Sequence, residues 1–337
     1  MPPNWYKILS LTAAIATLNL TSAKAQAAFL VSSRGTNSVL AYNEKNGNFL
    51  GTFVTPGNGL NGPDGLAIGP DGNLYVANLF GNSILRYNGN TGKFIDVFVP
   101  TSSGGLDEPV DIRFGPDGYL YVTSVESNSV LRYNGQTGAY IDAINEGLKQ
   151  PLGIAFGKNH DLYVTSRNQS NVRRYDIQTK VLIDTFIPSG SGGLDLASGI
   201  NFGSDGNLYV SSFRNNSVLR YNCETGEFID SFVSNGSGGL VGTGAVVFDD
   251  KGNLYATGLL SNNVLVYNGE NGEFIDAFVP SGSGGLKTPV LGVVFAPNAN
   301  PESVPEPTAE SSLLLLGAVG IGATLKQQRK KQHCRIS

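Results

Sequence analysis

The sequence has few of the residues from which proteins build disulfide frameworks, thiolate metal centres and histidine-based catalysis. Among 337 residues there are two cysteines, two histidines, one methionine and one tryptophan. Cys223 and Cys334 do not indicate a disulfide pair, and a thiolate metal site needs several clustered ligands. His160 occupies a turn where other parts of the chain have Asp-Gly, and His333 lies near the C-terminus. This distribution argues against a histidine dyad or a histidine-activated nucleophile.

Charged residues are also scarce, at 15% of the chain, whereas glycine is abundant, with 44 residues. Because glycine is costly inside helices, this composition favours turn-rich β structure. Residues 28–300 contain 16 Lys and Arg against 24 Asp and Glu, a balance of −8. An acidic body repels phosphate backbones, so we expect no nucleic-acid partner.

Residues 1–27 have the order of a secretory signal peptide. Lys7 precedes an apolar run over 8–20, and small residues follow, among them Ala25 and Ala27. Cleavage after either alanine would release the rest of the chain for export. We therefore predict a location in the periplasm, the cell envelope or the extracellular space; a buried first strand is the alternative interpretation.

The C-terminal region divides into three parts: a polar linker over 299–310, an apolar run over 311–325 and a basic tail over 326–337. As a helix the apolar run would rise about 22 Å, short of the roughly 30 Å hydrocarbon core, so it suits a transient sorting helix better than a permanent anchor. The positive charges that follow are expected to stay cytoplasmic.

The linker carries a proline-glutamate box, formed by Val304, Pro305, Glu306 and Pro307. The box, the apolar run and the basic end together closely resemble the PEP-CTERM sorting signal of bacterial envelope proteins. This resemblance implies a membrane enzyme of the exosortase type as a partner, and an association with exopolysaccharide-producing systems. A plain C-terminal membrane anchor is the alternative.

Between these ends the chain repeats itself with a period near 45 residues. A segment ending in Tyr-Asn or Tyr-Asp recurs six times, with spacings of 45, 46, 42, 46 and 46 residues. Periods of this size are typical of repeat arrays and propellers. The tyrosines are Tyr42, Tyr87, Tyr133, Tyr175, Tyr221 and Tyr267.

Each repeat contains four short β-like runs separated by turns rich in Asp, Asn and Gly. In the second repeat the runs cover 65–68, 74–77, 83–87 and 94–98. Glycine and asparagine supply the positive φ that tight hairpins need. Four antiparallel strands make one propeller blade, so the fold class predicted is all-β, a six-bladed β-propeller over residues 28–298.

The ends of the array favour a closed ring over a solenoid. The first repeat begins at Phe29 with what is the second strand elsewhere, and a spare innermost strand follows the last repeat at 292–295. Pairing the spare strand with the first blade completes six four-stranded blades and leaves no free edge. We therefore expect the last strand to close onto the first blade.

The repeat units also resemble a known family. Segments such as 69–76 followed by 82–87 are similar to NHL and YVTN-type propeller repeats, and the resemblance covers nearly all of residues 29–297. Propellers with related repeats include calcium-dependent lactonases, gluconolactonases and a streptogramin lyase. These enzymes use acidic or asparagine ligands around the central channel, or a histidine base.

Only three residues match such a ligand pattern. Asp64 and Asp111 precede the apolar part of innermost strands in adjacent repeats, and Asn78 follows the second strand of the repeat that contains Asp64. Calcium takes six to eight oxygen ligands, with carboxylates prominent, so these three could form a site between neighbouring blades. Solvated or turn-capping roles are the other interpretation, and no cofactor is expected on that basis.

Strand parity separates the two faces of the predicted ring. The loops between second and third strands emerge with the blade connectors on one face, where the repeats differ from one another. Arginine and aromatic residues are common anchors of recognition surfaces. The binding residues predicted there are Arg34, Phe80, Glu126, Arg167, Phe213 and Arg214.

The sequence is therefore compatible with two functions. The first is a secreted or envelope-associated binding or scaffold module, without enzymatic activity, for a polysaccharide, peptide or matrix partner. The alternative is a calcium-dependent lactonase-like hydrolase centred on Asp64, Asn78 and Asp111.

Overall fold

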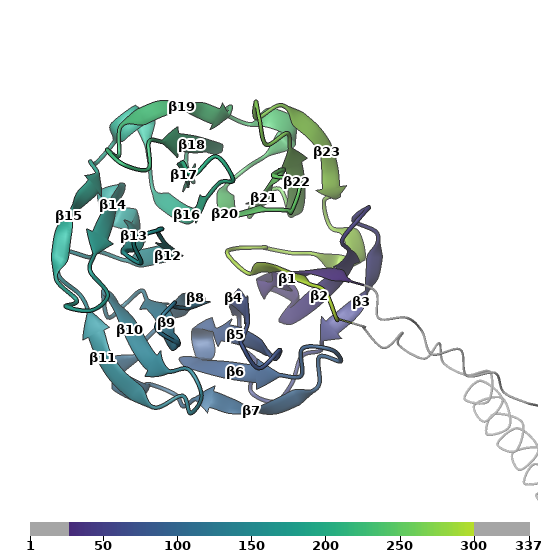
Figure 1. The fold of residues 1–337 in the computed structure, drawn as a ribbon. Coiled ribbons are helices and arrows are strands. Elements are labelled where there is room, and N and C mark those ends of the chain that lie inside the picture. The colour runs from purple at the N-terminus through teal and green to yellow at the C-terminus, as the bar shows by residue number, and fades with distance from the viewer. Residues whose placement is uncertain (1–26, 300–337) are drawn as a thin grey trace, which may run out of the picture.

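Residues 27–299 of the protein are described by a computed structural model, and they form six four-stranded antiparallel sheets arranged around a central axis (Figure 1). The predicted signal peptide, sorting box, apolar helix and basic tail fall on residues 1–26 and 300–337, outside the described range. Within residues 27–299 no helix is long and apolar enough to span a membrane. The expectation of a six-bladed propeller is confirmed.

The first three blades are given from the innermost to the outermost strand. Blade 1 contains β24 (Val293–Ala296), β1 (Ala28–Ser33), β2 (Ser38–Asn43) and β3 (Phe49–Val54). Blade 2 contains β4 (Pro63–Ile68), β5 (Leu74–Asn78), β6 (Ser83–Tyr87) and β7 (Phe94–Val99). Blade 3 contains β8 (Pro109–Phe114), β9 (Tyr119–Ser124), β10 (Ser129–Asn134) and β11 (Tyr140–Ile144).

The remaining blades follow the same order. Blade 4 contains β12 (Pro151–Phe156), β13 (Leu162–Ser166), β14 (Asn171–Tyr175) and β15 (Leu182–Ile187). Blade 5 contains β16 (Ala197–Phe202), β17 (Leu208–Ser212), β18 (Ser217–Tyr221) and β19 (Phe228–Val233). Blade 6 contains β20 (Thr243–Phe248), β21 (Leu254–Gly258), β22 (Asn263–Tyr267) and β23 (Phe274–Val279).

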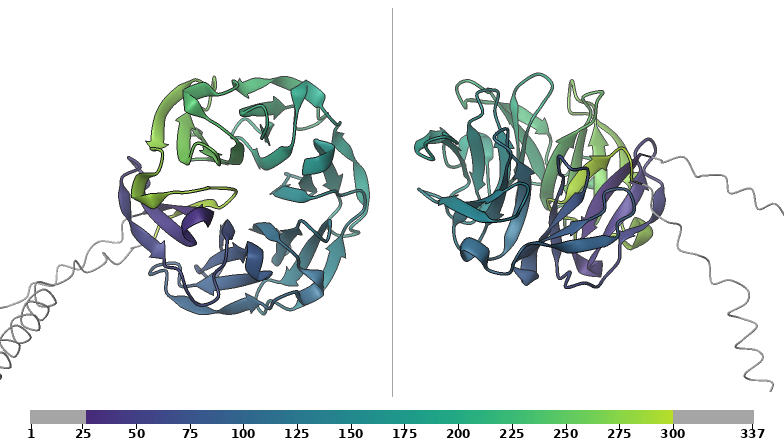
Figure 2. Two further views of the ribbon diagram at one scale, coloured as in Figure 1. Left: turned by 180° about the vertical axis from the view of Figure 1, so that it is seen from behind. Right: turned by 60° about the horizontal axis from the view of Figure 1, so that its bottom comes forward.

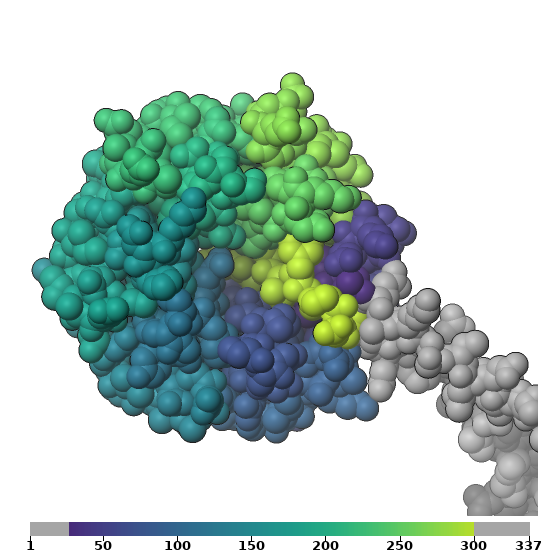
Figure 3. All heavy atoms as spheres, in the orientation of Figure 1, coloured from purple at the N-terminus to yellow at the C-terminus, as the bar shows by residue number. Residues whose placement is uncertain are grey.

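The ring closes inside blade 1, where the two ends of the described chain lie in one sheet (Figures 1 and 2). Strand β24 pairs antiparallel with β1, and Phe295 stands opposite Phe29. The amide of Ser32 also donates to the carbonyl of Gly292 at 2.8 Å. The predicted closure is therefore confirmed in its register, and the space-filling view shows the C-terminal end of the described chain, in yellow, packed beside its N-terminal part, in purple (Figure 3).

Aromatic and aliphatic side chains fill the space between blades. Phe29, which is fully buried, lies with its ring centroid 5.5 Å from that of Phe278 and 4.9 Å from that of Phe295. The repeat tyrosines are buried as well, and five of them donate a hydrogen bond to a connector carbonyl; Tyr133, for example, donates to Ser103 at 2.8 Å. The residue that marks the period in the sequence thus joins each of these blades to the loop before it.

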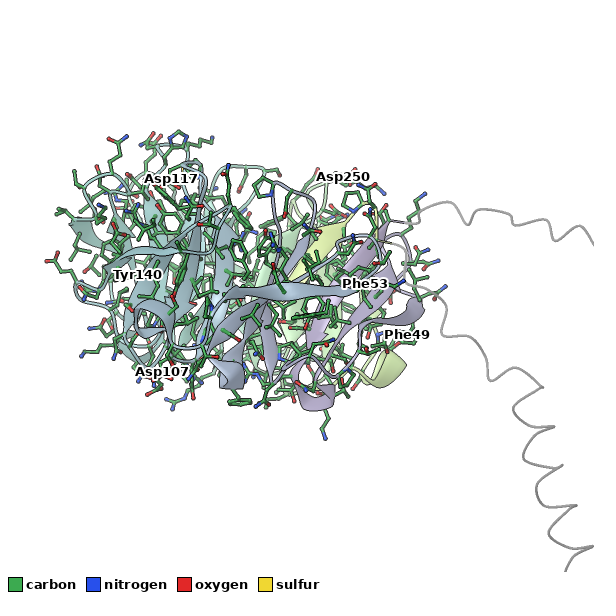
Figure 4. All side chains as sticks on the ribbon, turned by 90° about the horizontal axis from the view of Figure 1, so that it is seen from below. Phe49, Phe53, Asp107, Asp117, Tyr140 and Asp250 are labelled. Atoms are coloured by element: carbon green, nitrogen blue, oxygen red, sulfur yellow. The ribbon has the colours of Figure 1, made fainter. Side chains whose placement is uncertain are left out.

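The propeller has two distinct faces. On the first, called the turn face, lie the turns between first and second strands and between third and fourth strands. On the other, called the connector face, lie the loops between second and third strands together with the blade connectors. Figure 4 shows Asp117 and Asp250, which lie in turns between first and second strands, on one face, and Asp107, which lies in a connector, on the opposite face.

The connector face carries the short 3-10 helices found within residues 27–299. Three follow second strands, and four lie in the connectors between blades. They are η1 (Arg34–Thr36), η2 (Leu79–Gly81), η4 (Arg167–Gln169), η3 (Ser103–Gly105), η5 (Ser191–Gly193), η6 (Ser237–Gly239) and η7 (Ser283–Gly285).

Candidate functional site

The wall of the central channel is mainly aliphatic. Innermost strands of five blades line a cavity of about 400 Å³, and its only charged or amide side chains among the described residues are Asp111, Arg113 and Asn201. Such a wall excludes water and packs well, but it offers few groups to orient a polar ligand. The polar side chains gather instead at the connector-face end of the channel.

The loops at this end are held in place from blade to blade. In five blades the first residue after the second strand donates its amide to the preceding connector, as Arg167 does to the Gln150 carbonyl at 3.1 Å. In blade 1 Gly35 donates instead, to the Lys287 carbonyl at 3.0 Å. In five blades an asparagine in the left-handed region then accepts an amide from the next blade: Asn82, with φ of 48°, accepts from Glu108 at 2.8 Å. In blade 4 Ser170 takes this place and accepts from Leu196 at 2.9 Å. Asparagine tolerates this conformation better than most residues. The variable side chains are therefore presented from rigid loops.

Three arginines predicted from the sequence converge at the channel mouth. Arg34 and Arg167 begin η1 and η4, and Arg214 lies in the loop after β17. Burial lowers the pKa of Arg167, and the charges of Arg214 and Arg34 lower it further. Blades 1, 4 and 5 thus each contribute one cation to this part of the mouth.

The arginines differ in their partners. Arg34 forms an ion pair with Asp64, whose side chain is fully buried. Arg214 is 64% exposed and lies 3.7 Å from the carboxylate of Asp195. Arg167 is half-buried, and within residues 27–299 no carboxylate lies within ion-pair distance of its guanidinium. This cation is therefore partly desolvated without a compensating anion.

The side chain of Arg167 lies on an aromatic ring from the next blade. Its guanidinium carbon is 5.6 Å from the ring centroid of Phe213, which is itself half-buried. Cation–π contact of this kind fixes the plane of the guanidinium while leaving its N–H groups free for a ligand. Arg167 and Phe213 thus form one preorganised unit at the mouth.

Phe80 and Glu126, the other two predicted binding residues, lie on blades 2 and 3. Phe80 is 56% exposed, and its ring packs beside Gly62. Glu126 is exposed and accepts a hydrogen bond from Gln150 at 3.4 Å. Burial, followed by the charges of Glu126 and Asp107, raises the pKa of Glu108. The blade 3 side of the mouth is thus acidic, and the structure does not bring Glu126 into the arginine group.

The three candidate calcium ligands are only partly brought together. Asp64 and Asp111 both lie in innermost strands of adjacent blades, and both are buried. Burial raises the pKa of each, and the charge of Asp111 contributes to the rise at Asp64. Asn78 faces the connector, where its amide bonds the backbone of Gly59 and Asn61.

The carboxylate oxygens of Asp64 and Asp111 already accept hydrogen bonds from the protein. Asp111 accepts the amides of Ile112 and Ile154, each at 2.9 Å, so it ties blade 3 to blade 4. Asp64 accepts the amide of Leu291 at 3.1 Å in addition to the Arg34 guanidinium. Within the described residues no group of three or more His, Cys, Asp or Glu side chains is placed to hold a metal ion.

The sequence analysis did not predict that aliphatic side chains fill part of the channel mouth. Leu79 and Val125 occupy the same loop position as Arg34 and Arg167, yet they are 4% and 6% exposed and pack in the core. Their aliphatic nature was the signal available in the sequence. The only histidine in the described range, His160, lies on the turn face, in a pocket shared with Asp117 and Arg132.

Comparisons with known proteins place the fold. No family model matches the chain, and no curated protein matches its sequence. A chain of a nidogen/laminin complex is similar with a TM-score of 0.63 and 16% identity, over 81% of this chain and all of that one. A streptogramin B lyase is similar with a TM-score of 0.58 and 17% identity, over 83% of this chain and 93% of that one.

A third solved structure is a catalytically inactive histidine-to-alanine variant of virginiamycin B lyase from Staphylococcus aureus with quinupristin. It has a TM-score of 0.52 and 19% identity, over 83% of this chain and 87% of that one. At sequence identities this low, the similarity shows that the fold is shared but does not show that the activity is shared. What this chain shares with all three is the propeller fold.

Proposed function

We propose that the protein is an exported binding or scaffold module whose connector-face mouth holds a carboxylate-bearing partner, such as an acidic exopolysaccharide or matrix polymer. The observation that carries this proposal is Arg167, a half-buried guanidinium with no anion beside it among the described residues. A ligand carboxylate would supply the missing charge.

The surrounding groups suit a sugar acid. Guanidinium and carboxylate groups form paired, charge-assisted hydrogen bonds, and Arg214 lies close enough to Arg167 to perturb its pKa. The ring of Phe213 offers an apolar surface against which the C–H face of a pyranose can pack. Asp64 neutralises Arg34, so this arginine shapes the mouth rather than competing for the ligand.

A lyase is supported less well. The neighbour from Staphylococcus aureus is described as inactive when one histidine becomes alanine. In the described part of this chain the one histidine, His160, is at the turn face, away from the arginine group. A related reaction here would need a different proton carrier.

The calcium-dependent hydrolase remains a second candidate, favoured by the buried carboxylates of Asp64 and Asp111 on adjacent blades. Strongly perturbed carboxyl groups are frequent at functional sites. Metal analysis of the purified protein separates the two functions. Stoichiometric calcium that is lost in Asp64→Asn and Asp111→Asn would favour the hydrolase over the binding module.

Export and sorting also belong to this proposal. The signal-peptide pattern over 1–27, the box at Val304, Pro305, Glu306 and Pro307, and the basic tail over 326–337 support processing by an exosortase-type enzyme. Mass spectrometry of the native protein tests this. A C-terminus near Pro307 supports sorting, whereas an intact basic tail contradicts it.

Binding at the mouth is tested with an array of neutral and uronate-containing glycans. We expect Arg167→Ala with Arg214→Ala to weaken binding of acidic glycans at least about 10-fold, because two charge-assisted contacts are lost. Lys158→Ala, which removes an exposed cation from a turn-face loop, is the matched control and should leave binding unchanged. Equal binding by the double variant and the natural protein would remove the mouth as the site.

A further inference from the structure

Four of the six blades contain an arginine cluster with the same geometry near the turn face. In each, an arginine of the third strand stands opposite an aspartate of the fourth strand. In blade 2, for example, Arg86 donates its Nε to Asp96 at 3.0 Å. The pairs are Arg86 with Asp96, Arg132 with Asp142, Arg174 with Asp184, and Arg220 with Asp230.

Aromatic rings form the second half of each cluster. The guanidinium carbon lies 4.9 Å from the Phe186 centroid in blade 4 and 4.9 Å from the Phe232 centroid in blade 5. In three of the blades the guanidinium also approaches the aspartate of the first turn, as Arg86 approaches Asp71 at 3.6 Å. Each arginine is thus held by two kinds of contact that favour a planar cation, paired carboxylate oxygens and an aromatic face.

Blade 6 has the same cluster without its arginine. Val266 occupies the arginine position and stands opposite Asp276. Tyr255 and Phe278 keep the aromatic arrangement, with ring centroids 4.9 Å apart in an edge-to-face contact, as between the tyrosine and phenylalanine of blade 2. Asp249 accepts the Tyr255 hydroxyl at 3.3 Å, as the first-turn aspartate does in blade 2.

A pocket lies where the guanidinium would be. Its volume is about 720 Å³, and its walls include Val266, Asp276, Phe278, Tyr255 and Asp249. Figure 4 shows the neighbouring Asp250 at the turn face, so the pocket opens on the face opposite the arginine mouth. Blade 1 offers no second pocket of this kind, because Ala41 stands there opposite Gly51 and the carboxylate is missing.

The carboxylates around this pocket outnumber its cations, with Glu44, Asp249, Asp250 and Asp276 against two lysines. Burial raises the pKa of Tyr255, and nearby carboxylates raise it further, whereas in blade 2 Arg86 opposes the effect of burial on Tyr75. Two lysines, Lys45 and Lys251, line the pocket, but within the described residues neither forms an ion pair with a carboxylate. The carboxylates that act on Tyr255 are Asp249, Asp250 and Glu44.

We propose that the blade 6 pocket binds an arginine side chain of a partner protein. The incoming guanidinium would pair with Asp276, lie on the ring of Phe278 and approach Asp249, as the chain's own arginines do in the sister blades. A volume of about 720 Å³ exceeds the needs of one guanidinium, which leaves room for the residues on either side. The site is separate from the mouth, and its occupant has the opposite charge.

The direct test uses the capped tripeptide acetyl-Gly-Arg-Gly-amide, titrated into the full protein by calorimetry or NMR. We expect saturable binding at one site. The lysine and citrulline versions of the peptide should bind at least about 10-fold more weakly, because they lack the planar cation or the charge. Absence of binding by the arginine peptide, or equal binding of the lysine peptide, would overturn the proposal.

Variants distinguish this pocket from any other acidic surface. Val266→Arg restores the arrangement of the sister blades, so it should fold and abolish binding of the peptide. Asp276→Asn should weaken binding at least about 10-fold. Asp96→Asn in blade 2, where the carboxylate is already paired with Arg86, is the matched control and should leave binding unchanged. Unaltered binding by Val266→Arg would show that the peptide lies elsewhere.

A gain-of-site variant completes the test. Arg220→Val converts blade 5 into a copy of blade 6, and the stoichiometry should rise from one peptide to two. Far-ultraviolet circular dichroism and a melting curve establish that this variant is folded before its stoichiometry is measured. A folded Arg220→Val protein that still binds one peptide would contradict the idea that the empty arginine position makes the site.

Discussion

The turn face and the connector face are built from the same repeat, yet they respond to different constraints. On the turn face five blades use an Asn-x-x-x-Gly turn and three use an Asp-Gly turn, and in four blades an arginine and an aspartate of the same blade are paired, as in Arg132 with Asp142. On the connector face the corresponding loop positions change from blade to blade, and Arg167 has no anion beside it. Repetition marks the part that holds the ring together, and variation marks the part available for recognition.

The largest effect is expected from a glycine of the turn face. Gly92 has φ of 69°, and a Cβ placed on it would lie 1.8 Å from the carbonyl oxygen of Phe53 in blade 1. Gly92→Val should therefore lower the free energy of unfolding by at least about 3 kcal/mol, through strain and the clash between blades. Urea unfolding followed by circular dichroism measures this.

A connector-face glycine provides the comparison. Gly105 has φ of 84°, but nothing lies within 4 Å of a Cβ placed there. Gly105→Ala should cost about 1 kcal/mol, from backbone strain alone. Equal losses at the two glycines would mean that the turn face is no more constrained than the connector face.

The next effect compares two arginines. Arg132, whose side chain is 5% exposed, pairs with Asp142 and lies 3.6 Å from Asp117. Arg132→Met should lower the free energy of unfolding by about 2–3 kcal/mol, because Asp142 then keeps only Lys180, at 3.1 Å, and Asp117 loses the cation beside it. Arg167→Met should change stability by less than about 0.5 kcal/mol or increase it, because it removes a half-buried cation that has no anion beside it among the described residues. A large loss in Arg167→Met would show a structural role for this arginine and weaken the case for a ligand.

The smallest effect concerns the pH dependence of stability. Burial raises the pKa of Asp111 in the folded state, so its contribution to stability is present below the unfolded value near 3.9 and is lost as the pH rises through the folded value. The Arg132 guanidinium lowers the pKa of Asp142, so its contribution is present above that value and is lost as the pH falls.

Melting temperatures measured between about pH 3 and pH 8 separate the two aspartates. Asp111→Asn should reduce the decline of stability as the pH rises, whereas Asp142→Asn should reduce the loss of stability in acid. Identical pH profiles for the two variants would contradict this assignment of opposite shifts.

Much of the fold could be predicted from the sequence because propeller repeats are local. The period of the tyrosines, the turn residues and the offset between Phe29 and the strand near Phe295 led to six blades and to the closing register. Strand parity also assigned the loops correctly to two faces. These features depend on backbone chemistry that acts within one repeat or between identical neighbours.

The details of the candidate sites could not be predicted in the same way. Asp64 and Asn78 were grouped as ligands, but one pairs with Arg34 and the other bonds its own connector. The stacking of Arg167 on Phe213 joins blades 4 and 5, and these residues are separated by one full repeat. The blade 6 pocket could not be predicted from Val266 alone, because valine is an ordinary strand residue. The pocket becomes evident when the side chains around Val266 are compared with those around the arginines of the other blades.

The sequence by itself determined the number of blades, the closure of the ring and the face on which each loop emerges, because hydrophobic periodicity and turn chemistry act over a few residues. Only the tertiary structure decided which charges are paired, as at Arg34 and Asp64, and which are left open, as at Arg167 and Asp276. Coulomb interactions and burial depend on distances between blades, and the linear order of residues does not contain those distances.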